Sequence, residues 1–115
     1  MAKVFTWPYA TDAIEIYDAK MDWGMRLERG AGLVFKCDDL IFDVDLNDIA
    51  CVCYTEPGLF KVGDITLFDS DNDVLKYVCE GREIPLMIDV KRKDKDVMHA
   101  ILDIFSRNGF EVMKL

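Results

Sequence analysis

The sequence contains no long hydrophobic run, few basic residues and a single histidine. No apolar stretch approaches the ~18 residues that a membrane-spanning helix needs. Residues 1–20 lack a basic start followed by an apolar segment and a small-residue cleavage site, the pattern of a secretory signal. We therefore expect a mature, cytoplasmic protein without a transmembrane segment.

Basic residues are outnumbered, since 14 of them stand against 22 acidic residues and the formal net charge is −8. Nucleic-acid phosphates and anionic lipid headgroups both attract basic surfaces. The one basic cluster lies between residues 91 and 95, and acidic residues interrupt it. The charge balance therefore predicts no nucleic-acid partner and argues against a membrane surface, and it favours solubility.

The shortage of histidine weighs against an enzyme, because the base that activates a nucleophile is usually a histidine. His99 is the only one, and helical spacing places it near Lys95 and Asp103 on a polar face. The sequence contains no G-x-S-x-G motif, phosphate-binding loop or dinucleotide fingerprint. We expect no enzymatic activity and no cofactor; an enzyme with an unrecognised acidic site is the weakest alternative.

The four cysteines are too few, and too irregularly spaced, for a metal knuckle. Cys51 and Cys53 flank one residue of an apolar stretch, so on a strand they share a face. A zinc site would favour a C-x-x-C pair with further cysteines or histidines nearby. With no sign of secretion, Cys37, Cys51, Cys53 and Cys79 are predicted to be reduced thiols that pack as small hydrophobic residues.

The chain has instead an ordinary apolar content of 51%, and its 115 residues suit one domain. Short apolar runs alternate with turn residues, which predicts a mainly β protein with about seven antiparallel strands. We expect residues 1–20 to form either an N-terminal extension or an additional strand. The expected strands cover residues 13–17, 24–29, 33–37, 40–46, 49–55, 60–69, 74–79 and 84–90. Pro85 lacks an N–H, so the last of these lies at a sheet edge or begins there.

The apolar period changes near the C-terminus, where Val97, Ile101, Ile104 and Phe105 recur at helical spacing. We expect one α-helix over residues 96–108, ended at Asn108-Gly109.

The stretch from Asp69 to Glu80 has acidic residues at calcium-loop spacing, with Asp71 and Asp73 between them. Its sixth position is Val74, where a calcium loop needs glycine, and strand-forming residues flank it. We therefore reject these four residues as metal ligands and predict the tip of a β-hairpin, because Asp and Asn tolerate turn geometry.

Three segments resemble the short bacterial pleckstrin-homology-like (PH-like) families: "LIFDVDLNDIACV", "GDITLFDSDNDVLKYV" and the helical "VMHAILDIF". The resemblance covers residues 24–110 and implies a barrel or sandwich with one C-terminal helix that serves as a binding module. Lipid-binding members place basic residues on their first hairpin. The corresponding residues here, Arg26, Arg29 and Lys36, are minor lipid-headgroup candidates, because the net charge opposes them.

The predicted function is protein–protein recognition, or self-association with a second copy, through a strand edge and the N-terminal aromatic segment. The alternative is a domain that binds a small ligand, a lipid headgroup or a metal. Aromatic residues are enriched at binding hot spots, and a groove beside the helix is a second possible contact. The residues expected to bind a partner are Trp7, Tyr9, Trp23, Tyr54, Met98 and Leu102. Trp23 has the competing interpretation of covering one end of the barrel, and Met98 and Leu102 that of core residues.

Overall fold

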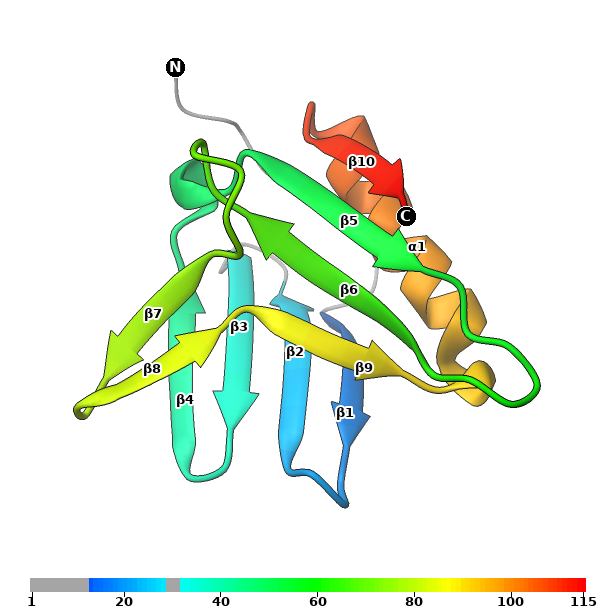
Figure 1. Cartoon of the computed structure of the whole chain (residues 1–115), viewed down its shortest axis with the longest axis horizontal. Helices are drawn as coiled ribbons and strands as arrows, with labels where there is room; N and C mark the ends of the chain where they lie inside the picture. The colour runs from blue at the N-terminus through cyan, green and yellow to red at the C-terminus, as the bar shows by residue number, and fades with distance from the viewer. Residues whose placement is uncertain (1–12, 29–31) are drawn as a thin grey trace.

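The computed structural model of the chain describes residues 13–28 and 32–115. Within them the fold is mainly β, with two four-stranded sheets, a two-stranded hairpin and one α-helix near the C-terminus (Figure 1). The two sheets face one another as in a sandwich, and the helix lies along one side. The predicted class, mainly β with a C-terminal helix, is confirmed.

The first sheet is an antiparallel meander in the order β1-β2-β3-β4. Its strands are β1 (Ala13–Asp18), β2 (Trp23–Glu28), β3 (Gly32–Cys37) and β4 (Leu40–Val44). Alternation of side chains explains the sheet, because Leu33, Phe35 and Cys37 are buried whereas Val34 and Lys36 are on the outer face. The first four expected strands are therefore confirmed in position.

The second sheet has the order β10-β5-β6-β9. It contains β5 (Cys51–Thr55), β6 (Gly63–Phe68), β9 (Met87–Val90) and β10 (Glu111–Lys114), and β10 runs parallel to β5. The hairpin of β7 (Lys76–Cys79) and β8 (Arg82–Pro85) extends away from this sheet, and two 3-10 turns, η1 (Leu46–Asp48) and η2 (Arg92–Asp94), complete the elements.

Helix α1 (Lys95–Arg107) begins and ends one residue before the predicted bounds. Gly109, with φ 85°, reverses the chain after it, as expected for a residue free to take left-handed geometry. The helix contacts β1 and β10 and thereby spans the gap between the two sheets on one side. Its buried stripe joins the main core, to which it contributes Met98, Ile101, Leu102, Ile104 and Phe105.

Of the two expected forms, barrel or sandwich, the sheets form no closed barrel, and the described residues contain ten strands instead of about seven. The expected strand over residues 84–90 is divided at Leu86. The N–H of Leu86 donates to the carbonyl of Leu75, and the carbonyl of Leu86 accepts from the N–H of Leu67. Leu86 therefore bonds to two different chain segments at the point where β8 ends and β9 begins. Strand β10 was not predicted, because four residues with one half-buried side chain carry no clear alternation.

The turn predicted at "DSDND" is confirmed as the connection between β6 and β7. One carboxylate oxygen of Asp69 accepts hydrogen bonds from the backbone N–H groups of Asp71 at 2.9 Å and Asp73 at 3.1 Å. Asn72 takes a left-handed conformation with φ 64°. Glu80 lies in the separate β7–β8 turn, where φ is 51°.

The four cysteines are free thiols. Cys37 and Cys53 are buried, as predicted, and burial raises the pKa of the Cys37 thiol. Cys51 and Cys79 are half-buried, and the sulfur atoms of Cys51 and Cys53 lie 3.7 Å apart on the outer face of β5.

Candidate functional site: a groove beside an edge strand

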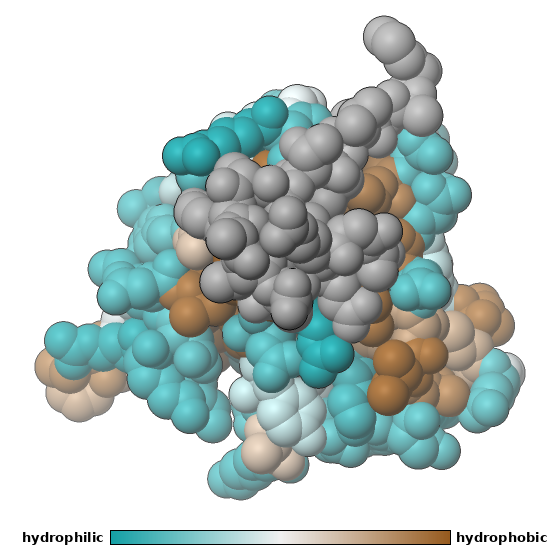
Figure 2. Space-filling view, turned by 180° about the vertical axis from the view of Figure 1, so that it is seen from behind, coloured by the Kyte–Doolittle hydropathy of each residue, from teal (hydrophilic) through white to brown (hydrophobic). Residues whose placement is uncertain are grey.

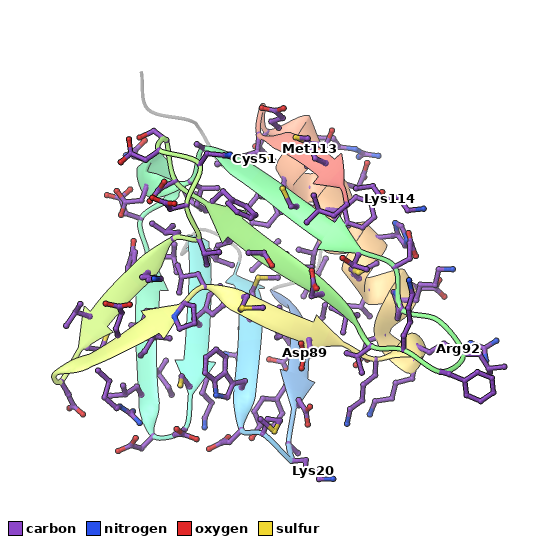
Figure 3. The ribbon with its side chains drawn as sticks, viewed as in Figure 1. Lys20, Cys51, Asp89, Arg92, Met113 and Lys114 are labelled. Carbon is purple, nitrogen blue, oxygen red and sulfur yellow. The ribbon has the colours of Figure 1, made fainter. Side chains whose placement is uncertain are left out.

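An apolar groove lies between the β1–β2 turn and strand β9, with a volume of about 210 Å³. Methionine, tryptophan and proline side chains form most of its wall, and an aspartate stands at each rim. The lining residues are Asp18, Met21, Trp23, Pro85, Met87, Ile88 and Asp89. We call this hollow the edge groove. Figure 3 shows Asp89 on β9 above the turn that carries Lys20.

The β1–β2 turn is held by its own side chains, which fixes one wall of the edge groove. A carboxylate oxygen of Asp18 accepts from the backbone N–H groups of Lys20 at 3.0 Å and Met21 at 3.4 Å. Asp22, with φ 54°, turns the chain into β2. The result is a firmly held turn that leaves Met21 58% exposed.

Strand β9 forms the other wall, and it is the last strand of its sheet within the described residues. The N–H of Leu67 donates to the carbonyl of Leu86 at 3.0 Å. In an antiparallel ladder every second residue bonds the neighbour, so Ile88 and Val90 face β6 and the backbone groups of Met87 and Asp89 point to the open edge. The groove therefore borders backbone donors and acceptors that have no strand partner among residues 13–28 and 32–115. Pro85, from which a strand edge or a strand start was expected, is the last residue of β8, two residues before β9 begins.

The rim of the edge groove is acidic. Burial of Asp18 disfavours its charged form, but the N–H groups of Met21 and Lys20 and the Lys91 ammonium, at 3.5 Å, outweigh it and lower the pKa. Asp18 is therefore negative at neutral pH.

Behind the rim, Asp89 lies directly opposite Asp64 of β6. Burial and, after it, the Asp89 charge raise the pKa of Asp64, one of whose oxygens is buried without a hydrogen-bond partner in the described residues. A cationic group placed here would relieve this repulsion.

A second hollow, of about 300 Å³, lies on the outer face of the first sheet above Gly24. Arg26 and Lys36, two of the lipid-headgroup candidates, both line it. Each already has an acidic partner, because Arg26 pairs with Glu15 at 2.8 Å and Lys36 with Asp22. The structure thus brings these two candidates together but neutralises them. Arg29 lies outside the described residues.

The expected partner-binding residues separate into three groups. Trp23 lines the edge groove and also packs on a small cluster of Cys37, Leu40 and Ile84. Its partner-binding role stays a prediction. Tyr54 is half-buried, with its ring edge against His99 at 5.9 Å between centroids. Trp7 and Tyr9 lie outside the described residues.

Met98 and Leu102 are corrected by the structure. Met98 is 0% exposed and Leu102 is 4% exposed, and both belong to the main core. The expected groove along this side of the helix is absent from the described structure, because the helix turns its apolar stripe inward between the sheets.

Most residues of the edge groove were not found by sequence reasoning. Met21 follows an irregular segment and carries no periodic signal, while Asp18 and Asp89 are single acids among many. The available signal was the combination of Pro85, which marks an edge strand, with a nearby unplaced tryptophan. Only the pairing of distant strands brings these features together.

No helix in residues 13–28 and 32–115 is long and apolar enough to cross a membrane. The same residues contain no group of three or more His, Cys, Asp or Glu side chains arranged to hold a metal ion. Comparison with known proteins yields no matching family model and no matching curated protein.

Proposed function

We propose that the chain is a non-enzymatic interaction module that binds an extended peptide segment of another protein along β9. The observation that carries this proposal is the coincidence of an open strand edge with an apolar groove. The edge supplies backbone hydrogen bonds, and the groove supplies contacts for side chains, which is how edge strands bind peptides.

The chemistry of the groove defines the partner. Met21, Trp23 and Met87 receive an apolar side chain, and flexible methionines adapt to several shapes. Met87 and Asp89 are two residues apart and share a face, so the matching positions of a paired peptide are also two apart. The partner segment therefore carries an apolar residue and, two positions away, lysine or arginine facing Asp89 and Asp64.

The expected affinity is modest. Burying one large apolar side chain contributes about 1.5–3 kcal/mol, and each backbone hydrogen bond contributes about 1 kcal/mol. The loss of translational and rotational freedom costs at least ~4 kcal/mol. These terms leave about 3 kcal/mol at most, so a four-residue edge supports a dissociation constant in the millimolar range.

PH-like membership is part of the proposal. A four-stranded meander, further strands and then a helix follow the order that the sequence resemblance implies, with the departure that β10 comes after the helix. This order supports the binding-module interpretation, and the groove residues give that interpretation its specificity.

The proposal is tested with a synthetic peptide that alternates Thr with Leu and Lys, so that leucine and lysine fall two residues apart. Isothermal titration calorimetry measures its affinity for the full chain. Asp89→Asn keeps the backbone N–H but removes the charge and weakens binding about fivefold. Asp89→Pro also removes the outward N–H and abolishes binding, while proline is tolerated at an edge position of this kind.

The matched control is Ile41→Ser, which changes a side chain 68% exposed on the other sheet and leaves the affinity unchanged. Circular dichroism confirms that each variant is folded. Equal affinities for the wild type and a folded Asp89→Pro variant would exclude pairing along β9. Light scattering in the absence of peptide reports whether a second copy of the chain occupies the edge instead.

A further inference from the structure

The loop between β5 and β6 presents apolar side chains to solvent at its tip. Phe60 is 96% exposed, and Leu59 and Val62 are 67% and 53% exposed. We call these three residues the apolar tip. The loop that carries them projects at the left edge of Figure 2, where hydrophobic atoms extend beyond a hydrophilic surround. The loop lies at the right of Figure 1.

The loop that carries the apolar tip is firmly built. The N–H of Gly58 donates to the carbonyl of Lys61 at 3.0 Å, which places Leu59 and Phe60 at the point of a tight turn. Pro57 is buried, and at Gly63 an added Cβ would lie only 2.3 Å from the carbonyl oxygen of Thr55. The base is therefore closely packed, and Phe60 is held outward by the backbone.

Basic residues lie in this loop and in the segment that follows β9, where Lys91 and Lys93 also line a hollow with Asp18 and Lys20 of the β1–β2 turn. Gly63 pairs with Val90, so the loop and the segment after β9 leave the sheet at the same end. Glu56 pairs with Lys95 at 3.6 Å and with His99 at 2.7 Å, which ties the loop to the start of α1. Figure 3 shows Arg92 beside the loop. We call the set the basic collar: Lys61, Lys91, Arg92, Lys93 and Lys95.

Most of the basic collar is available to a partner. Lys91 and Lys95 are in ion pairs with Asp18 and Glu56. Lys61, Arg92 and Lys93 make no ion pair with any residue in the described part of the chain.

We infer that this end of the molecule docks reversibly on an anionic lipid surface, with Phe60 in the interfacial region and the basic collar against the headgroups. The tip is convex and isolated, so it encloses no small ligand; it requires a medium into which it can insert. A bilayer interface accepts aromatic and aliphatic side chains and holds negative charge at the level of the collar. Neither feature suffices alone, because stable surface binding needs two signals.

The net charge of −8, which argued against a membrane surface, is unevenly distributed. The acidic β6–β7 turn and η1 lie at the side of the molecule opposite the β5–β6 loop (Figure 1). The longest dimension is 40 Å, whereas the Debye length is about 8 Å at physiological ionic strength. Distant acids are therefore screened from the surface that the collar touches. Asp94 and Asp96, together with Asp64 and Asp89 beside the Gly63–Val90 pair, are near enough to oppose it, so binding is weak and salt-sensitive.

The test is sedimentation of the full chain with large vesicles, either of phosphatidylcholine alone or of phosphatidylcholine mixed with phosphatidylserine. We expect binding to the mixed vesicles and its loss at high salt. Phe60→Ser lowers the partition coefficient about tenfold. Arg92→Gln and Lys93→Gln lower it about fivefold each.

The matched control is Val78→Ser, which removes a side chain 72% exposed on the β7–β8 hairpin and leaves vesicle binding unchanged. Met21→Ser also leaves it unchanged, because Met21 belongs neither to the apolar tip nor to the basic collar. Phe60→Ser folds like the wild type, since Phe60 is almost fully exposed.

Failure of the wild type to sediment with phosphatidylserine vesicles at low salt would overturn the inference. Equal effects of Val78→Ser and Phe60→Ser would do the same. If light scattering showed a dimer that Phe60→Ser dissociates, with no vesicle binding, the tip would be a protein contact instead.

Discussion

Single residues in this fold are constrained to very different degrees, and two glycines five positions apart show the range. A Cβ on Gly63 would lie 2.3 Å from Thr55 O and 2.5 Å from Pro57 N, both backbone atoms that cannot move independently. A Cβ on Gly58 would meet the flexible Lys61 side chain at 3.2 Å. The neighbouring atoms, rather than the glycine itself, decide the cost of adding a methyl group.

We therefore expect Gly63→Ala to destabilise the fold by about 2–4 kcal/mol through steric overlap. Gly58→Ala should change stability by less than about 1 kcal/mol. Urea unfolding followed by Trp fluorescence measures both. Similar midpoints for the two variants would contradict the close packing at the base of the β5–β6 loop.

Asp64 gives a pH-dependent prediction at the same scale. Because burial and the facing Asp89 raise its pKa in the folded state, its stabilising contribution is present at low pH and is lost as pH rises through that folded-state pKa. Asp64→Asn removes the penalty, so it should raise stability at neutral pH by a few tenths of a kcal/mol and give no gain near pH 3. Asp43→Asn, at an exposed position of β4, is the control. A gain that is independent of pH would exclude charge as its cause.

At the scale of elements, the burial of the apolar stripe of α1 decides whether its residues bind a partner or belong to the core. Met98→Ala should destabilise the fold by about 2–5 kcal/mol, because Met98 is 0% exposed and its loss leaves a cavity. Thermal unfolding measures this, with Ser106→Ala on the exposed face of the helix as control. A stable Met98→Ala variant with weakened peptide binding would restore the expected groove beside the helix.

Local patterns predicted the elements that are regular within themselves. Alternation located β1 to β4, helical spacing located α1 within one residue, and turn chemistry located the reversal at Asp69 to Asp73. Features that depend on distant chain segments escaped prediction. Leu86 divides an apparently continuous strand, because its backbone bonds to both Leu67 and Leu75. Strand β10 forms by pairing with the edge of β5, which is distant in sequence.

The candidate site was less predictable than the fold for the same reason. Trp23 and Pro85 are 62 positions apart in sequence, and only the stacking of the two sheets brings them into one groove. The sequence pattern also does not reveal how exposed a side chain is. Phe60 and Phe105 are both phenylalanines, yet Phe60 is 96% exposed and Phe105 is 0% exposed.

At the scale of the whole molecule, the fold presents two adjoining surfaces: the edge groove with its acidic rim, and the apolar tip with its basic collar. The Lys91–Asp18 ion pair lies where they meet. The opposite charges of the two surfaces predict different partners and different responses to salt. A chain that binds a peptide through one surface and a lipid headgroup region through the other would bring that peptide to a membrane. Binding of a peptide along β9 is the function proposed for the chain.

Hydrogen exchange of single backbone amides along β9, followed by NMR with and without the alternating Leu and Lys peptide, tests that claim most directly. In the free protein the Ile88 and Val90 amides should exchange slowly and those of Met87 and Asp89 rapidly. Saturating peptide should slow exchange at Met87 and Asp89, because their N–H groups then bond the added strand. Rapid exchange at Met87 and Asp89 in the presence of bound peptide would contradict the proposed pairing along β9.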